Sequence, residues 1–172
     1  MSSTNGRGME IYTTGLRNQH AVENQAVEIL SRQVERLENY PEMEARIRQH
    51  IEESRVQAQR IEELLSSLGT SHSSLKDAAL GLAGNMAALM HTVAPDEVLK
   101  NSLANYAFEH FEIASYKSLL TLSDAVGGAA DQSALKQSLG EEVDMAQWID
   151  QHLPDTTMRY LQRSEAGLQA GV

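Results

Sequence analysis

Glutamate side chains stand in this sequence at positions where a folded protein normally buries apolar residues. Four long segments each carry apolar residues at alternating spacings of three and four, the pattern of a helix with one buried face. A glutamate lies in or beside the apolar stripe of every segment, and the second segment adds a histidine. These candidate site residues are Glu23, His50, Glu53, Glu109, Glu112 and Glu142.

Metal binding is the chemistry that this arrangement favours. An ionised carboxylate is costly in a low-dielectric interior, and several carboxylates held together repel one another. Two divalent cations would offset both costs. In four-helix bundles, inward glutamates combined with a Glu and a His three residues apart form dinuclear sites for iron or manganese. We therefore predict that the six residues bind two divalent transition-metal ions, iron in the first place and manganese in the second.

The pattern departs from the usual dinuclear site in two places. His50 and Glu53 have the spacing of three in reversed order, and Met145 stands where a histidine would follow Glu142. The third segment offers a second glutamate instead, Glu112 three residues after Glu109. The predicted site is therefore richer in oxygen ligands than usual, and the sequence leaves open whether one metal position is lost.

Four further polar residues are interpreted as supporting side chains. His20, His110, Gln57 and Tyr116 are better suited to holding a ligating carboxylate by hydrogen bonds than to binding metal. Any single glutamate in such a stripe more often tilts toward solvent or pairs with a basic neighbour. Its repetition in all four segments favours the metal site.

The composition narrows the class of protein. The chain has 172 residues, of which 41% are hydrophobic and only 5% aromatic, and this favours a single all-α domain. The net charge of -10 argues against binding to nucleic acid or to anionic membrane surfaces. The sequence has no cysteine, no signal-peptide pattern and no apolar run of membrane-spanning length. These features predict a cytoplasmic protein whose metal ligands are carboxylates and imidazoles.

Four helices are needed to position the site. Pro41 opens the second helix, Gly127 follows the third and Pro154 closes the fourth. The predicted helices cover residues 12–39, 41–67, 94–125 and 131–153.

The connections between the helices predict the topology. The short first and last connections join antiparallel neighbours, whereas a long crossover containing a short fifth helix at residues 75–90 joins the middle pair. We expect a flexible arm at residues 1–10, the bundle at 11–158 and a tail at 159–172. The fold class predicted is an all-α, ferritin-like four-helix bundle.

Three stretches of the sequence also resemble known motifs. Residues 108–116, Phe-Glu-His-Phe-Glu-Ile-Ala-Ser-Tyr, resemble the Glu-His-Tyr-Glu-Ile-Ala-x-Tyr signature of the YciF/YciE-like bacterial ferritin-like family. Residues 50–57 resemble the family's His-x-Glu-Glu-Thr-x-x-Gln motif, and residues 21–25 resemble its first-helix segment less closely. The resemblance covers residues 10–153, but the crossover lacks the family's Cys and Met-Glu-Gly element.

The resemblance implies a function without fixing a reaction. It implies a homodimer with a dinuclear metal site made by the same six residues and an association with bacterial stress responses. The substrate would be metal ions or a small oxidant, oxygen or peroxide. Oxidase, catalase-like and iron-sequestering chemistries all suit such a site, so the sequence leaves open whether the protein is an enzyme. The alternative is a non-catalytic helical interaction module that retains the fold without metal.

Overall fold

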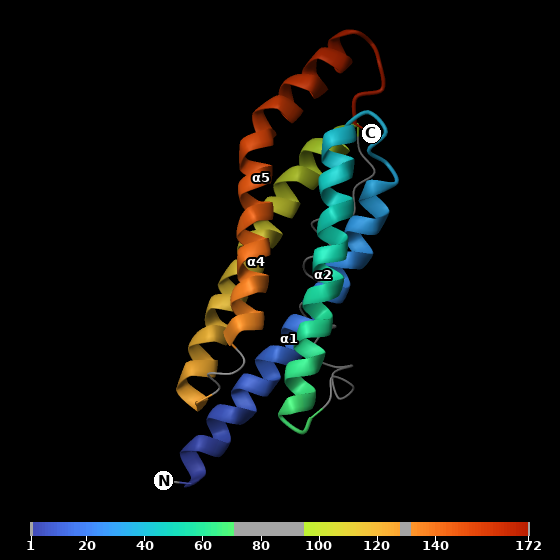
Figure 1. Cartoon of the computed structure of the whole chain (residues 1–172). Helices are drawn as coiled ribbons and strands as arrows, with labels where there is room; N and C mark the ends of the chain where they lie inside the picture. The colour runs from blue at the N-terminus through green and yellow to red at the C-terminus, as the bar shows by residue number, and fades with distance from the viewer. Residues whose placement is uncertain (1, 71–94, 128–131, 172) are drawn as a thin grey trace.

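The described residues form an all-α bundle of four long helices (Figure 1). The computed structural model describes the backbone of residues 2–70, 95–127 and 132–171, and side chains from residue 6 onward. Helix α1 packs along α2 and α4 along α5, and α1 lies next to α4. The predicted short helix at residues 75–90 lies outside the described residues. The four helices are α1 (Ser2–Val34), α2 (Pro41–Ser67), α4 (Glu97–Val126) and α5 (Gln132–Glu165).

The first two helices are joined by a tight turn that begins earlier than expected. Helix α1 ends at Val34, not at residue 39. After Val34, backbone hydrogen bonds between residues three apart replace the bonds between residues four apart that define an α-helix. The Tyr40 amide donates to the Leu37 carbonyl at 2.7 Å, and both side chains are buried. Pro41 then takes the first position of α2, where its missing N–H costs nothing.

The third described helix begins at this same end of the bundle. Arg36, in the turn, donates two hydrogen bonds of 2.9 and 2.8 Å to the carboxylate of Glu97 at the start of α4. Helix α2 ends at the opposite end, where Thr70 accepts a bond from Arg17 of α1. The connection between α2 and α4 therefore joins opposite ends of the bundle, as expected of a long crossover.

The structure differs from the flexible arm expected at residues 1–10. Residues 2–10 continue α1, which begins at Ser2. Met9 packs against the buried side chains at this end of the bundle. Gly8 approaches α4 so closely that a Cβ atom there would lie 3.2 Å from Val126 Cγ1. Tertiary contact with α4 thus holds a stretch whose Ser, Asn and Gly residues favour no helix by themselves.

Helix α5 also extends beyond its predicted end. Pro154 lies inside it, and the helix continues to Glu165. A proline removes one backbone hydrogen bond and bends the helix, and contacts made beyond it can offset that loss. Thr156 is buried and Tyr160 packs against the core, so the turns after Pro154 have such contacts. Figure 1 shows the upper part of α5 leaning away from the direction of its lower part.

The expected tail at residues 159–172 is partly helical, and its last described residues are docked. After α5 the chain reverses at Gly167, whose φ of 67° is left-handed. The buried Ala170 carbonyl accepts a hydrogen bond from the Tyr40 hydroxyl, and the Gly171 carbonyl accepts one of 3.1 Å from the Val98 amide in the first turn of α4. The tail therefore satisfies an amide that the helix itself leaves free.

Replacing Tyr40 by Phe is expected to loosen this docking. The substitution removes one buried hydrogen bond, worth about 1 kcal/mol, and leaves the Ala170 carbonyl without its donor. Amide hydrogen exchange should become faster at residues 168–171 and in the first turn of α4, with little change elsewhere. Unaltered exchange in these two stretches would contradict the docking role of the hydroxyl.

Among the described residues, two large apolar clusters fill the upper and lower parts of the bundle and leave a gap between them. The upper core lies near the turn between α1 and α2, and the lower core lies near the opposite end. The upper core comprises Leu30, Val34, Leu37, Tyr40, Ile47, Ile51, Val98, Met145 and Ile149. The lower core comprises Tyr12, Leu16, Ile61, Leu64, Leu65, Tyr116, Leu119 and Leu135. The side chains between the two cores form the polar layer described below.

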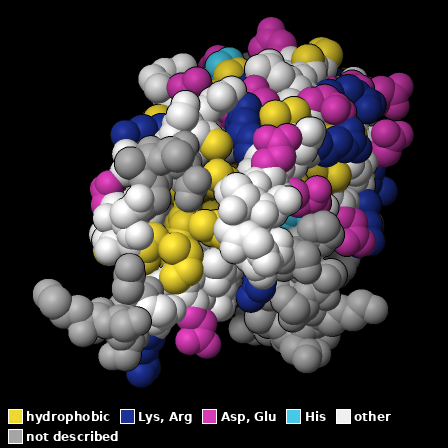
Figure 2. All heavy atoms as spheres, turned by 60° about the horizontal axis from the view of Figure 1, so that its bottom comes forward, with side chains coloured by type: hydrophobic (Ala, Val, Ile, Leu, Met, Phe, Trp, Pro, Cys, Tyr) yellow, Lys and Arg dark blue, Asp and Glu magenta, His cyan; other side chains and the backbone are white. Residues whose placement is uncertain are grey.

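The surface carries charges of both signs. Figure 2, which turns the lower end toward the viewer, shows Asp and Glu interspersed with Lys and Arg, with hydrophobic side chains gathered in one area. Pairs such as Arg48 with Glu44, at 2.9 Å, join neighbouring turns of one helix. Within the described ranges, no helix combines the length and the apolar character needed to cross a membrane.

Candidate metal centre

The centre of the polar layer is a group of four fully buried side chains from three helices. His50 comes from α2, Glu109 and Glu112 from α4, and Glu142 from α5. The spacing of three puts the two glutamates of α4 on one face, directed toward the bundle axis. One ligand atom from each of the four lies within 4.8 Å of the others. The structure therefore brings together four of the six predicted site residues.

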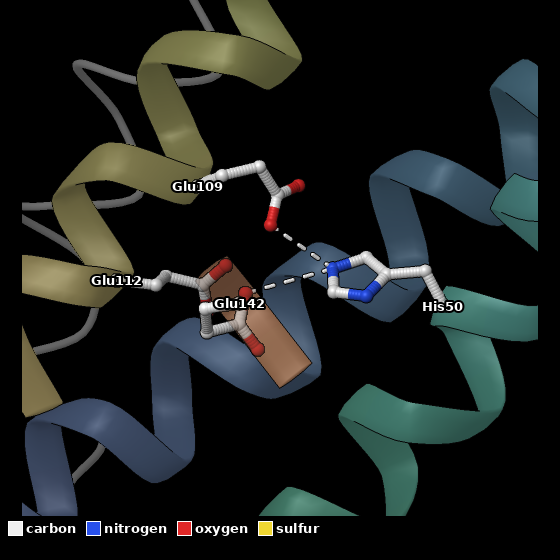
Figure 3. Close-up of side chains that lie close together, drawn as sticks. All are labelled: His50, Glu109, Glu112 and Glu142. Carbon is white, nitrogen blue, oxygen red and sulfur yellow. Dashed lines mark ion pairs between the residues drawn. The ribbon is translucent and has the colours of Figure 1, made fainter. Parts of the chain in front are cut away.

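The imidazole of His50 is directed at the carboxylates (Figure 3). Its Nε2 atom lies 3.1 Å from Glu109 Oε2 and 3.6 Å from Glu142 Oε2. The three carboxylates approach from the other side of the layer, with Glu112 and Glu142 close together in the view. A metal ligand nitrogen thus faces several carboxylate oxygens in a space closed to solvent.

Glu23 of α1 lies beside this group and is also fully buried. Its Oε1 accepts a bond of 2.5 Å from the Tyr116 hydroxyl and one of 2.9 Å from the Gln19 amide. The same Gln19 amide lies 3.4 Å from Glu112 Oε1. Gln19 and Tyr116 therefore connect the fifth predicted residue to the layer, and Tyr116 has the supporting position that the sequence predicted.

Gln19 is a component that the sequence reasoning missed. It stands one turn before Glu23, so its side chain lies on the same face of α1. A polar residue at that spacing from a buried carboxylate is the signal that would have found it.

Glu53 lies apart from the other carboxylates. It contacts the opposite ring nitrogen of His50, with Nδ1 at 3.0 Å from Glu53 Oε2. Arg46 donates to the same oxygen at 3.0 Å, and Gln49 donates to Oε1 at 2.7 Å. The carboxylate is thus occupied by three donors on its own helix. It orients the histidine in this structure, whereas the sequence placed it among the metal ligands.

The other histidines singled out in the sequence lie outside the layer. His20 contacts Glu62 at 2.7 Å on the surface of α1 and α2. His110 is exposed and packs edge to face against Tyr106, with ring centres 4.6 Å apart. Gln57 is fully buried and its amide nitrogen donates to Glu141 at 3.0 Å. Its amide oxygen, Oε1, is buried without a hydrogen-bond partner.

Burial and mutual repulsion disfavour the charged state of the carboxylates. Burial raises the pKa of Glu23 to about 7, even though bonds from Tyr116 and Gln19 act in the opposite direction. Burial raises the pKa values of Glu112 and Glu142 well above the ordinary range, and the neighbouring carboxylates raise them further. Without a cation, the layer therefore tends to hold protons.

His50 and Glu53 shift toward their charged forms. Burial lowers the pKa of His50, but the carboxylate of Glu109 and the bond to Glu53 outweigh it and raise the pKa well above its usual value. Burial acts to raise the pKa of Glu53, whereas its bonds to His50, Gln49 and Arg46 lower it to about 2. Glu53 is therefore an ionised partner for the histidine at neutral pH.

Buried polar atoms without a hydrogen-bond partner gather in the polar layer. Such atoms are rare in folded proteins and usually mark a missing water, ion or ligand. Most are carboxylate and amide oxygens, and when the carboxylates are ionised these oxygens can only accept hydrogen bonds and cannot satisfy one another. Among the described side chains they are Gln19 Oε1, Glu23 Oε2, His50 Nε2, Ser54 Oγ, Gln57 Oε1, Glu109 Oε2, Glu112 Oε2 and both oxygens of Glu142.

Comparison with known proteins places the chain in a family. The profile of a family described as a domain of unknown function, DUF892, matches residues 8–162. A crystal structure of a protein from Xanthomonas campestris is 28% identical, with a TM-score of 0.77, and the match covers 92% of this chain and 99% of that one.

Two further solved structures share the fold at lower identity. The stress protein YciF of E. coli is 21% identical, with a TM-score of 0.74 and coverage of 90% and 97% of the two chains. YcfI from Rhodopseudomonas palustris is 23% identical, with a TM-score of 0.72 and coverage of 87% and 97%. These matches confirm the resemblance seen in the sequence motifs. The chain belongs to the DUF892 family and has the fold of YciF.

Proposed function

We propose that this protein is a ferritin-like dinuclear carboxylate metalloprotein that handles oxygen, peroxide or iron in a bacterial stress response. The observation that carries the proposal is the set of buried acceptor atoms without partners in the polar layer. Family membership and the similarity to a stress protein support the link to stress. The homodimer stays a prediction of the sequence.

The donor set fits two divalent cations of the iron and manganese type. One ion would be held by His50 Nε2 with Glu109 and Glu142. A second would be held by Glu23 and Glu112, which share the Gln19 amide and each have an oxygen without a partner. Carboxylate oxygens with a single imidazole suit these metals better than copper or soft ions. Bound iron or manganese would supply one-electron redox chemistry.

The protein's own residues would manage orientation and protons. Glu53 accepts from His50 Nδ1, so that Nε2 faces the carboxylates and would offer its lone pair to a cation that displaces its proton. The Tyr116 hydroxyl donates to Glu23 and fixes one of its oxygens, which leaves Oε2 for a cation. The protons held by Glu23, Glu112 and Glu142 would be displaced when cations bind, because ligating carboxylates must be ionised.

Calorimetric titration of chelator-treated protein tests this proposal. Anaerobic Fe²⁺ and, separately, Mn²⁺ are expected to bind to a limit of two ions per chain, with protons released at neutral pH. The proton count comes from repeating the titration in buffers of different ionisation enthalpy. A protein that takes up neither metal would contradict the proposal and favour the non-catalytic helical module.

A further inference from the structure

The buried centre needs a path to solvent, because its four side chains are at most 1% exposed. Toward α1 and α4 it is covered by the buried side chains of Val22, Ala26 and Phe108. Toward α2 and α5 it is covered by two ion pairs, Arg46 with Glu53 and Arg60 with Glu141. The lower core contains several side chains with no exposed surface. The upper core is buried as well, but it borders two cavities that lie upward along the bundle axis.

An open pocket lies in that direction, between the first turn of α2 and the upper part of α5. This outer pocket has a volume of about 420 Å³ and is lined by Tyr40, Met43, Trp148, His152 and Arg159 among others. Charged side chains stand at its rim, so water fills it readily.

A narrow cavity continues from the outer pocket into the bundle. We call it the neck. The two share Met43, Trp148, His152 and Thr156, and the neck has a volume of about 10 Å³. Its inner lining is Ile47, Ser102, Asn105, Met145 and Ile149.

The inner end of the neck lies one helical turn above the candidate metal centre. Ile47 stands three residues before His50 on α2, and Met145 stands three residues after Glu142 on α5. Asn105 stands four residues before Glu109 on α4. Residues three or four apart lie on the same helix face, separated by about 5 Å along the axis. Three helices therefore place a neck residue directly over a site residue.

The chemistry of the neck selects what could pass through it. No Asp, Glu, Lys or Arg lines it. The Ser102 hydroxyl donates to the Val98 carbonyl at 2.8 Å, and the Asn105 amide exchanges bonds of 2.8 and 3.2 Å with Gln33. The polar groups of its inner lining, Ser102 and Asn105, are therefore already engaged within the protein. A hydrated cation would lose water ligands here without replacement, at high cost.

We propose that the outer pocket and the neck form the passage by which a small, neutral, apolar molecule, dioxygen, reaches the candidate metal centre. The proposal rests on the function proposed above and names the oxidant of that site. Met43 and Met145 are flexible side chains in the neck, and their rotation can open a cavity that is narrow in its resting state.

Dioxygen itself is the probe that tests this passage. It is paramagnetic and speeds the relaxation of methyl groups that it approaches. Methyl-labelled methionine reports three depths, because Met158 lines only the outer pocket, Met43 lines both cavities and Met145 lines only the neck. We measure the increase in methyl relaxation rate that dioxygen pressure causes in metal-free protein with methyl-labelled methionine and leucine. We expect a larger increase at Met145 than at Leu65 of the lower core, although both side chains are 0% exposed.

Narrowing the neck should lower the relaxation enhancement that dioxygen causes at Met145, and widening it should raise that enhancement. Ile149 lines the neck and not the outer pocket. Ile149→Phe is expected to lower the enhancement at Met145 and leave Met158 unchanged, and Ile149→Ala is expected to raise it. Ile61→Ala makes an equivalent cavity in the lower core and should leave Met145 unchanged. If Ile149→Phe does not fold, the pair of alanine variants decides.

The outcomes separate this proposal from the proposed function. Equal enhancement at Met145 and Leu65, or a Met145 signal that follows neither change at Ile149, would overturn the passage. Because the measurement uses metal-free protein, a failure to bind iron or manganese would leave its result intact. A bulky gadolinium chelate should relax Met158 much more strongly than Met145, and an effect on Met145 as strong as that on Met158 would overturn the size selection.

Discussion

Metal-free protein is expected to lose stability as the pH rises from 4.5 toward 8. Glu23 has a pKa of about 7 when folded against an ordinary value of 4.5, so between these values the folded chain binds more protons than the unfolded chain. Stability falls with pH wherever that holds. The difference corresponds to about 3 kcal/mol above pH 7, and Glu112 and Glu142 act in the same direction.

The pKa shifts of His50 and Glu53 also contribute to the pH dependence of stability, His50 at high pH and Glu53 at low pH. The raised pKa of His50 contributes stability that is complete below about 6.5 and is lost as the pH rises through the raised value. The lowered pKa of Glu53 contributes stability above 4.5 that is lost as the pH falls toward 2. The most stable pH of metal-free protein should therefore lie near 4.5, where the contribution of Glu53 is almost complete and the loss from Glu23, Glu112 and Glu142 has only begun.

Urea unfolding in chelator across this pH range measures the effect. Glu23→Gln should flatten the decline, since glutamine keeps an oxygen for Tyr116 and cannot ionise. Saturating iron or manganese should reverse the trend, because ionised ligands bind cations more tightly as the pH rises. Stability that climbs steadily from pH 4.5 to 8 without metal would contradict the electrostatic description of the layer.

The second large effect is expected from two neighbouring glutamates of α5 that receive the same substitution. Glu142→Gln should weaken metal binding by at least about tenfold, because it removes a charged oxygen from the centre. In chelator at neutral pH the same variant should be more stable than the wild type. Its amide needs no proton to be neutral, and it relieves the repulsion among Glu109, Glu112 and Glu142.

Glu141→Gln is the matched control, and we expect it to keep its metal affinity and to lose stability in chelator. Glu141 accepts from Arg60 at 2.6 and 3.0 Å and from Gln57 at 3.0 Å, outside the four-residue group. Metal affinity should be nearly unchanged. Stability should fall by about 1 to 3 kcal/mol, because the mostly buried guanidinium of Arg60 loses its charged partner.

Calorimetry gives the metal affinities and urea unfolding in chelator gives the stabilities. A Glu142→Gln variant that is less stable without metal, and that still binds two ions, would identify Glu142 as an ordinary structural carboxylate. Loss of metal binding in Glu141→Gln would show that the metal centre lies on the Glu141 side of α5 and not at the four-residue group that contains Glu142.

Much of the candidate site could be predicted from the sequence, because the side-chain direction on a long helix follows from local geometry. Residues at spacings of three and four share one face whatever the helix packs against. Glu109, Glu112 and Glu142 therefore had to lie inward once their apolar neighbours did, and the structure buries all three. The bounds of α2 followed in the same way from Pro41 and Gly69.

Helix ends that depend on distant contacts could not be predicted. Pro154 is a local signal for a helix end, yet Thr156 and Tyr160 find buried positions beyond it and α5 continues. The Ser- and Gly-rich start of the chain carries no local signal for a helix. It becomes helical where Gly8 and Met9 meet α4 and the lower core.

The sequence by itself predicted inward-facing acidic and imidazole side chains on all four helices, because helical periodicity is a local property. Only the tertiary structure decided which of them meet. Glu53 and Glu142 lie on similar faces in the sequence pattern. In the structure, Arg46 and Gln49 donate hydrogen bonds to Glu53. Among the described residues, His50 is the only basic side chain in contact with Glu142. Which charges pair depends on the distances between helices, and a periodicity along one chain segment does not contain those distances.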